Sequence, residues 1–322
     1  MAKTTVIIPN YNGMKYLPQC IASLRRQTEQ DFKILVVENA STDGSLEWLT
    51  ENRIPLIREQ ENLGFAGGVN AGIRAADTPY VLLLNNDTEV FPDFVEQMEQ
   101  EIARHRKLFS VSAMMLQTQN HSLIDDAGDG MTLMGWAYQR GKGLPRDGYG
   151  RGADIFSSCA GAAIYRRDIL KKIGLFDEMH FAYLEDIDLC WRAKLYGYFN
   201  RYCADARVYH YGSATSGSRY NAFKVRLSAR NHIWTMYKNQ TNWQLLLHLP
   251  WLLAGLFAKA VFFRGLGLFP AWMEGNLEGL GRLHQLRRVD FRQVPTSRLL
   301  ALEWELIRGT AAYLLQYLER MH

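Results

Sequence analysis

The sequence has little of several features that would assign a function at once. Its 322 residues carry a formal net charge of only +4, with a pI near 8.8, which is too weakly basic to indicate nucleic-acid binding. Its four cysteines lie far apart and include no C-x-x-C pair, so they are predicted to be reduced packing residues. The chain also shows no internal repeat and no low-complexity tract.

Three common motifs are missing as well. Only a short apolar stretch precedes Pro9, so the N-terminal segment is predicted to be a first strand and not a signal peptide. The chain is therefore expected to remain in the cytoplasm. The glycine-rich segment 62–70 is neither G-x-G-x-x-G nor a P-loop, which disfavours nicotinamide cofactors and ATP hydrolysis.

The first 110 residues alternate between two kinds of pattern. Apolar residues make up 48% of the chain and charged residues 22%, which is typical of a globular protein with one large α/β domain and an appendage, or with two domains. Strands alternating with helices predict a mostly parallel sheet with helices on both faces. The expected strands are 5–8, 32–37, 54–58 and 80–84, and the expected helices are 17–27, 45–52, 65–76 and 91–104.

From about residue 110 the pattern changes. We expect further strands at 109–116, 155–166, 199–202 and 207–211, and helices at 167–173 and 185–196. Between them, residues 125–152 are rich in glycine and carry Trp136, Tyr138 and Tyr149. A long irregular segment inside a compact domain is usually functional, so this one is predicted to be a lid or a binding loop.

The final third is different again. A helix with a basic face is expected at 223–237, and the strongly apolar segment 245–263 follows it. His248, Pro250 and Lys259 interrupt that segment, so we expect a helix pair lying at a membrane interface instead of a membrane-spanning helix. The alternative is an ordinary helical subdomain packed on itself. Basic residues that suit an anionic membrane surface follow at Arg282, Arg287, Arg288, Arg292 and Arg298.

The most informative short stretch is Asn85-Asn86-Asp87, which ends the apolar run Tyr80–Leu84. Open α/β sheets bind their ligands at the carboxyl ends of buried strands. A carboxylate at such a position can hold a divalent cation, and the cation can hold phosphates. The alternative is a polar turn that simply closes the strand.

Several other short polar segments of the sequence are similar to this one, and together they resemble the motifs of a known protein family. Taken singly each is weak, because helix caps and helix packing explain them equally well. In this order, they make the chain resemble a family 2 inverting glycosyltransferase with the GT-A fold, over about residues 4–240. The closest similarity is to the bacterial rhamnosyltransferase-like branch that builds cell-surface polysaccharides. The motifs are T-V-I-I-P-N-Y-N-G (5–13), E-N-A-S-T-D-G-S (38–45), N-L-G-F-A-G-G-V-N (62–70), L-L-N-N-D-T (83–88), G-L-F-D-E (174–178), F-A-Y-L-E-D-I-D-L-C-W-R (181–192) and V-Y-H-Y-G-S-A-T (208–215).

The resemblance implies a metal and nucleotide-sugar site. Asp87 matches the last acid of the family's metal motif, which binds Mn²⁺ or Mg²⁺ and the donor diphosphate; Asn85 and Asn86 stand before it, so the site has one carboxylate where many relatives have two. His210 matches a histidine that completes the metal shell, and the alternative is a buried histidine at a strand end. The residues implied in nucleotide-sugar binding are Pro9, Asn10, Tyr11, Glu38, Asn39, Asn62, Gly67, Asn70, Asn86 and Asp87. Glu38 stands where Asp is usual, and its carboxylate could accept a hydrogen bond from a base imide N–H.

The resemblance also implies the catalytic groups. Asp186 matches the catalytic base, and the alternative for it is an acid of the first helical turn that the helix dipole favours. Glu185 is expected to orient the site or the acceptor. Asp188 lies two residues on and faces another side of the helix, so it is expected to be structural, paired with Arg192. One base without a carboxylate nucleophile predicts inversion at the anomeric carbon.

The expected organisation follows from these roles. Residues 1–110 would form the nucleotide-sugar-binding half and 111–220 the acceptor and catalytic half of a GT-A domain, with a helical region at 221–322. The expected donor is dTDP-rhamnose, with another UDP- or GDP-hexose as the alternative. The expected acceptor is a glycan or a polyprenyl-linked glycan, on the inner face of the cell membrane. The 125–152 loop would cover the donor or shape the acceptor site, with Trp136 either stacking on a sugar or anchoring the loop.

Two other classes of protein remain as competing interpretations. A nucleotidyltransferase would need a basic, glycine-rich triphosphate loop near the N-terminus, which Pro9-Asn-Tyr-Asn-Gly13 does not provide. A non-catalytic nucleotide-sugar-binding protein or membrane scaffold would keep the fold and lose an acid, yet Asp87, Asp186 and His210 are all present.

Overall fold

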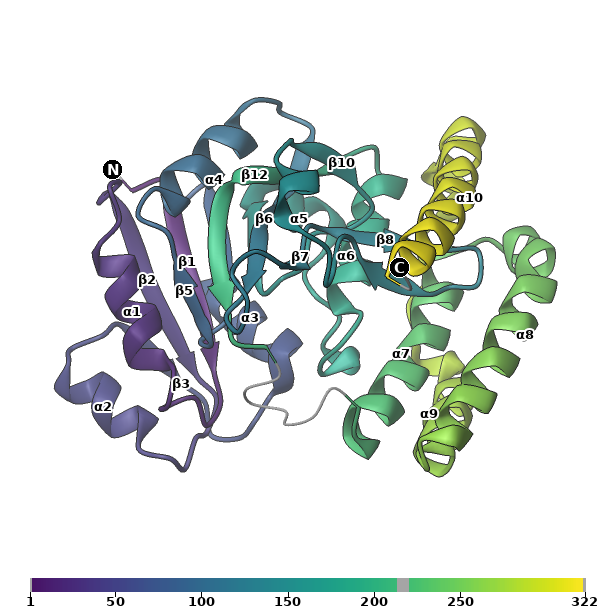
Figure 1. Ribbon diagram of the computed structural model, residues 1–322, viewed down its shortest axis with the longest axis horizontal. Coiled ribbons are helices and arrows are strands. Elements are labelled where there is room, and N and C mark those ends of the chain that lie inside the picture. The colour runs from purple at the N-terminus through teal and green to yellow at the C-terminus, as the bar shows by residue number, and fades with distance from the viewer. Residues whose placement is uncertain (1, 213–219, 321–322) are drawn as a thin grey trace.

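A computed structural model of the chain shows a twisted sheet covered by helices, with a group of long helices beside it (Figure 1). The structure describes residues 2–212 and 220–320. The end of the last family-like motif, Ser213 to Thr215, lies outside the described residues.

The N-terminal half is built as the alternating pattern predicts. Four of its strands are parallel neighbours in the order β4-β1-β2-β3, and β1 pairs with β2 from Thr4↔Phe32 to Asn10↔Glu38. Because these strands run in one direction, their carboxyl ends lie at one edge of the sheet. The elements are β1 (Thr4–Asn10), α1 (Leu17–Arg25), β2 (Phe32–Glu38), α2 (Ser45–Glu51), β3 (Leu56–Arg58), α3 (Gly64–Ala75), β4 (Tyr80–Leu84), β5 (Thr88–Val90) and α4 (Phe94–Ala103).

The second half of the sheet makes it mixed, where a mostly parallel sheet was predicted. β11 (Ala162–Arg166) runs antiparallel to both of its neighbours, β4 and β6 (Leu108–Gln117), whereas β12 (Phe199–His210) runs parallel to β6. The full order is β10-β12-β6-β11-β4-β1-β2-β3. An apolar run predicts a strand but not its direction, which here depends on the long excursion between β6 and β11.

Two strand boundaries also differ from the prediction. The run expected as one strand at 155–166 is divided into β10 (Ala153–Ile155) and β11, because the chain turns between them. The two strands expected at 199–202 and 207–211 are one strand, β12, whose register on β6 shifts between Cys203 and Arg207. A bulge of this kind adds residues without ending the strand.

The core consists of one apolar layer on each face of the sheet. Val6 and Ile8 of β1 face helices α1 and α4, while Ile7 faces α3. Leu82 and Leu83 of β4 divide in the same way. This alternation is the period of two expected for a strand buried on both faces, and it fixes the register that brings the strand ends together. The helices α5 (Arg167–Ile173) and α6 (Glu185–Leu195) cover the same face as α3.

The glycine-rich segment has more structure than a loop. It contains β7 (Ile124–Asp126), β8 (Asp129–Met131), β9 (Ala137–Gln139) and the 3-10 helix η1 (Arg146–Tyr149), and β8 pairs with β9 as a hairpin. The Trp136 ring lies edge-on to Tyr313 and under Lys259, 5.8 and 5.4 Å away, so it anchors the segment to the C-terminal helices.

The C-terminal helices pack on the rest of the chain through α6 and β8. The α7 helix begins at Ala222, next to the predicted boundary at 220/221, and it packs on α6 and α9, while α10 packs on α6 and β8. The segment 245–263, expected as a helix pair, lies in the single helix α8, which continues through Pro250 although an interior proline removes one backbone hydrogen bond. The helices are α7 (Ala222–Asn239), α8 (Asn242–Gly265), α9 (Phe269–Gly281) and α10 (Thr296–Glu319), with 3-10 turns at Glu178–His180, Leu283–Gln285 and Phe291–Gln293.

Candidate functional site

Three neighbouring strand ends are joined by a chain of hydrogen bonds. The Asn10 amide at the end of β1 donates to Glu38 Oε2 at the end of β2 over 2.6 Å. The Asn86 amide, just after β4, donates to Asn10 Oδ1 over 2.7 Å. Gly13 lies against the same side chain, since a Cβ on Gly13 would come within 1.9 Å of Asn86 Nδ2. The predicted polar residues of β1, β2 and β4 therefore form one rigid edge.

Glu38 borders a cavity of about 150 Å³ at this edge. Its side chain is 1% exposed, and its second oxygen accepts from the backbone N–H of Ser41 over 2.7 Å. The carboxylate thus already has two donors and fixes the turn that follows β2. Arg58, Glu59 and Gln60 line the opposite side of the cavity.

The residues at the glycine-rich start of α3 take part in hydrogen bonds and packing within the protein. Asn39 Nδ2 donates to Asn62 Oδ1 and to the carbonyl of Gly64, both over 3.0 Å. Asn70 donates to the carbonyl of Phe176 over 2.8 Å and to Glu178, so its amide is occupied away from the strand ends. A Cβ on Gly67 would lie 2.7 Å from that of Leu63, which accounts for this glycine by packing within the helix. Pro9 is half-buried in β1, and the ring of Tyr11 is exposed.

Asp87 and His210 are brought together as expected. His210 ends β12, which pairs with β5 in the register His210↔Thr88, one residue from Asp87. Its Nε2 lies 3.4 Å from Asp87 Oδ1. Its Nδ1 lies 2.7 Å from a second carboxylate, Asp125 Oδ2, which comes from β7. The imidazole is therefore held between two buried acids.

The charges of His210 and Asp125 depend on one another. Burial would lower the pKa of His210, but the hydrogen bonds with Asp125 and Asp87 outweigh it and raise the pKa to about 9. Burial would raise the pKa of Asp125, but its bonds to His210 and Lys142 lower it to about 2. Without a cation, the ring is thus protonated at neutral pH, and a bound cation would take the place of that proton.

Asp186 is connected to the sheet edge that carries Asp87 through the segment Cys159–Gly161. The N–H of Asn85 donates to the carbonyl of Gly161 over 2.9 Å. The N–H of Ala160 donates to Asp186 Oδ2 over 3.3 Å, while Asp186 Oδ1 accepts from the N–H of Ile187. The carboxylate lies in the first turn of α6 and is half-buried. Burial raises the pKa of Asp186, with the two N–H groups partly opposing it, which favours proton uptake.

The turn before Asp186 is strained and is held from outside. Phe181, Tyr183 and Leu184 all have positive φ, which costs about 1–3 kcal/mol each for such residues. The Asn231 amide from α7 donates to the carbonyls of His180, Ala182 and Tyr183 at 2.7–2.9 Å. A C-terminal helix therefore fixes the position of the segment that presents Asp186.

The other two acids of this helix have different environments. Glu185 is buried, its Oε2 has no hydrogen-bond partner among the described residues, and burial together with Asp186 raises its pKa well above the usual value. The charged form of Glu185 is therefore disfavoured. Asp188 is fully buried and accepts from Arg192 at 3.1 Å and from Lys238 at 2.9 Å, in the structural role expected for it.

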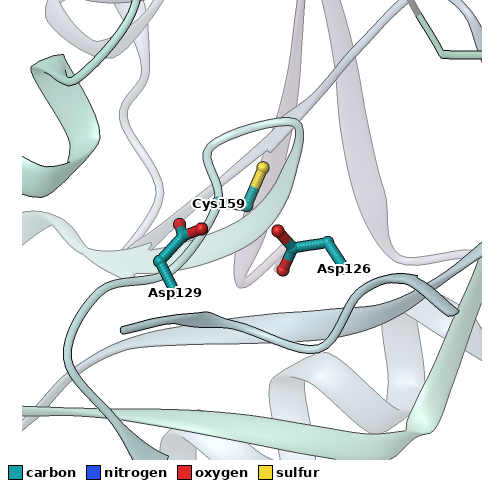
Figure 2. A group of neighbouring side chains, drawn as sticks. All are labelled: Asp126, Asp129 and Cys159. Atoms are coloured by element: carbon teal, nitrogen blue, oxygen red, sulfur yellow. The ribbon is translucent and has the colours of Figure 1, made fainter. Parts of the chain in front are cut away.

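Two further acids approach Asp186 from the glycine-rich segment. Figure 2 shows Asp126, Asp129 and Cys159 directed toward a common space, with one ligand atom of each within 4.8 Å of the others. Burial and repulsion by Asp125 raise the pKa of Asp126 to about 7. Burial, Asp126 and Asp186 raise that of Asp129 well above the usual value. The pair therefore retains a proton at neutral pH, and the three donor atoms are near enough to hold one cation.

One pattern in the sequence could have indicated these residues, which the sequence analysis missed. Asp125, Asp126 and Asp129 form the run I-D-D-A-G-D, in which three acids stand next to a glycine in an otherwise irregular segment. Which acid faces His210 and which faces Asp186 depends on the pairing of β7 with β6 and of Asp129 with Ser157.

A family model for "Glycosyl transferase family 2" matches residues 5–174 of the chain, which is 170 of its 322 residues. The chain belongs to glycosyl transferase family 2. The matched range contains the strand ends, Asp87 and the acids of the glycine-rich segment, and it ends before Asp186 and His210.

Curated relatives are similar over the N-terminal part. Glycosyltransferase GlyG of Streptococcus pneumoniae is 30% identical over 103 residues, covering 30% of this chain and 34% of the relative. The teichoic acid poly(glycerol phosphate) polymerase of Staphylococcus epidermidis is 33% identical over 96 residues, covering 28% and 13%. The matches therefore span well under two thirds of the relatives' own length.

Solved structures share the fold over more of the chain. S. aureus TarS 1–349 aligns with a TM-score of 0.57 and 18% identity, covering 96% of this chain and 89% of TarS. A mannosyltransferase from Pyrobaculum calidifontis, solved with GDP-Man and Mn²⁺, aligns with a TM-score of 0.55 and 14% identity, covering 86% and 87%. At these identities the likeness establishes a GT-A-like α/β fold.

Proposed function

We propose that the protein is an inverting glycosyltransferase that transfers a sugar from a nucleotide donor to a glycan or lipid-linked glycan in cell-surface polysaccharide synthesis. The observation that carries the proposal is the link between two chemical groups at one sheet edge. The Cys159–Gly161 segment joins them, because Gly161 accepts from Asn85, two residues before the Asp87–His210 pair, and Ala160 donates to Asp186. A donor diphosphate and an acceptor hydroxyl need two such neighbouring sites.

Asp186 is the proposed base. Its carboxylate is fixed by the N–H groups of Ala160 and Ile187, so its orientation does not depend on substrate. It accepts the proton of the attacking hydroxyl as the new bond forms on the face opposite the departing nucleoside diphosphate. Burial disfavours the charged form of Glu185, which a carboxylate nucleophile would need, and this supports inversion.

The residues around Asp87 fit a divalent cation. A buried carboxylate oxygen and an imidazole nitrogen face each other over 3.4 Å, and mixed oxygen and nitrogen ligation suits Mn²⁺ at least as well as Mg²⁺. When bound, the cation would offset the negative charge of the donor diphosphate. Asp87 and His210 would hold it, and the Asn86 amide is fixed beside them by Asn10.

Rhamnose from dTDP-rhamnose is the proposed donor group. Its support is the resemblance of the motif set to rhamnosyltransferase-like enzymes, whereas TarS has been solved with UDP-GlcNAc and the Pyrobaculum enzyme with GDP-Man. A screen of dTDP-, UDP- and GDP-sugars for nucleoside diphosphate release, with and without Mn²⁺, tests this. Release from a UDP- or GDP-hexose and not from dTDP-rhamnose would reassign the donor and leave the reaction class in place.

The base assignment has its own test. Asp186→Asn keeps the size of the side chain and removes the basic oxygen, so sugar transfer is expected to fall by about 100-fold or more, the usual contribution of a general base. Donor affinity, measured by calorimetry, should stay at the wild-type value. Transfer at a near wild-type rate would contradict the role of Asp186.

We also propose that the C-terminal helices bind the surface of a membrane, on the cytoplasmic face. Within the described residues, α8 is long and apolar enough to cross a membrane by length and composition, and little of it is buried. Its polar residues Gln244, His248 and Lys259 share the face turned to the protein, where His248 Nε2 lies 2.7 Å from Glu303 of α10. Leu246, Leu253 and Phe257 are more than half exposed.

This arrangement is the reverse of a soluble amphipathic helix, which buries its apolar side. An apolar outer face of this length suits a lipid surface. Exposed Arg264, Arg282 and Arg287 follow it and suit anionic headgroups. Arg288 and Arg298, predicted to join them, instead contact the carbonyls of Tyr237 and Leu195. Co-sedimentation with vesicles containing anionic lipid tests the proposal, and a protein that stays in the supernatant at low salt would contradict it.

A further inference from the structure

The imidazole of His210 is oriented by Asp125. A neutral histidine carries one ring proton, and the proton sits on the nitrogen that faces the better acceptor. Asp125 Oδ2 lies 2.7 Å from Nδ1, whereas Asp87 Oδ1 lies 3.4 Å from Nε2. The shorter contact places the proton of a neutral ring on Nδ1. The lone pair of Nε2 then points toward Asp87, the direction in which a shared cation must lie.

Asp125 is itself held firmly. Its other oxygen, Oδ1, accepts from Lys142 Nζ over 3.0 Å, and the same ammonium group donates to Gln139 Oε1 over 2.7 Å. The Asp125 side chain is 10% exposed, so water competes little for either bond. A buried carboxylate with two fixed donors has little freedom to turn, and its direction sets that of the imidazole.

The backbone supports the same alignment. The β6 strand lies between β7, which carries Asp125, and β12, which ends at His210. His210 pairs with Gln117, and Leu116 pairs with Ile124, so both side chains project from strands hydrogen-bonded to consecutive residues of β6. Groups placed on strands of one sheet keep their separation better than groups on loops.

We propose that Asp125 is a positioning residue that fixes His210 for coordination of the divalent cation together with Asp87. The inference rests on the proposed metal-dependent function and adds to it a residue outside the metal ligands. Carboxylate–histidine–metal arrangements generally depend on such a partner, whose loss lowers metal affinity by about 10- to 100-fold.

Titration of the purified full-length protein with Mn²⁺, followed by the electron paramagnetic resonance signal of free Mn²⁺, measures this directly. Asp125→Ala is expected to weaken Mn²⁺ binding by about 10- to 100-fold. Asp125→Asn keeps an oxygen facing Nδ1 and loses the charge, so its loss should be smaller than that of Asp125→Ala. Glu99→Gln is the matched control, because Glu99 is also a buried acid and accepts from the hydroxyl of Thr4, at the opposite end of β1 from the strand-end site. It should bind Mn²⁺ as the wild type does.

The outcomes separate the two proposals. Wild-type affinity in Asp125→Ala, or an equal loss in Glu99→Gln, overturns the positioning role while the metal site stands. A wild-type protein that binds no Mn²⁺ overturns the metal site and with it this inference. Circular dichroism checks that each variant is folded, and if Asp125→Ala does not fold, unchanged affinity in Asp125→Asn overturns the role alone.

Discussion

At the scale of single residues, buried charges decide which acids are available for chemistry. Asp188 and Asp186 are two positions apart on α6, yet Lys238 and Arg192 lower the pKa of Asp188 well below its usual value, against the effect of burial, whereas burial raises that of Asp186. The cationic partners keep Asp188 ionised and structural. Asp186 has backbone N–H groups as its partners and remains able to take a proton.

Lys238→Met tests the structural role of Asp188. The ammonium group contacts Asp188 at 2.9 Å and Asp177 at 2.5 Å, and its side chain is 4% exposed. Removing it leaves buried carboxylate charge uncompensated, so the free energy of unfolding, from urea denaturation, is expected to fall by about 3–5 kcal/mol. Lys33→Met breaks an exposed pair with Asp77 and should leave the free energy of unfolding nearly unchanged. Equal effects of the two variants would contradict the account.

At the scale of elements, α8 has one polar side that faces the protein and one apolar side that faces outward. His248 and Lys259 tie one side of it to α10 and to Trp136, while the apolar remainder faces outward. In Figure 1 this helix lies at the right-hand margin of the molecule, beyond α7 and α9. The element is therefore attached to α10 and to the glycine-rich segment by its polar groups, and its apolar groups stay exposed, as the proposed contact with a lipid surface requires.

Phe257→Glu tests the sidedness of this helix. Phe257 is 72% exposed, so the folded protein should tolerate the change. Loss of a buried phenylalanine from the lipid interface removes about 1.5–3 kcal/mol, so vesicle affinity should fall by at least about tenfold. Gln100→Glu serves as the control, because it adds the same charge on the exposed side of α4, far from α8 in the sequence. A similar loss in both variants would assign the effect to net charge and not to the helix face.

At the scale of the whole molecule, two buried histidines lie where the C-terminal helices pack on the rest of the chain. His180, before α6, packs edge-on against Trp234 of α7, and His232 of α7 lies beside the carbonyl of Met134. Burial lowers the pKa of His180 to about 4 and of His232 to about 3. Both rings are therefore neutral in the folded protein at pH values where the unfolded chain already binds protons.

The sign of the pH dependence follows from this difference. The contribution of each ring to stability is complete above pH 6.5 and is lost as the pH falls toward 4. From pH 7 to 4.5 the free energy of unfolding should fall by about 2.5 kcal/mol for each ring, and urea titrations measure it. His180→Phe removes one of the two groups and should reduce the slope. His210 has a raised pKa and loses its contribution only as the pH rises toward 9, outside this range. A flat profile would contradict the prediction.

The sequence determined the parts of the fold that depend on local pattern. The strands and helices of the first 110 residues, the strand end at Asn85-Asn86-Asp87 and the candidate residues Asp186 and His210 could be predicted, because apolar periodicity and motif order lie within short segments. The family followed from the same motifs. The antiparallel direction of β11 and the unbroken course of α8 could not be predicted, because neither is encoded in the residues of the element itself.

The tertiary structure alone decided which partners the polar groups have. Asn70 and Asn39 match nucleotide-binding motifs, yet their amides are occupied by Phe176 and by Asn62 and Gly64. Asp125 comes from a segment expected to be a lid, yet it reaches His210 because β6 lies between their strands. Asn231, far along the chain, holds the turn before Asp186. Such contacts join residues distant in sequence, and their energies depend on burial and distance, which exist only once the chain is folded.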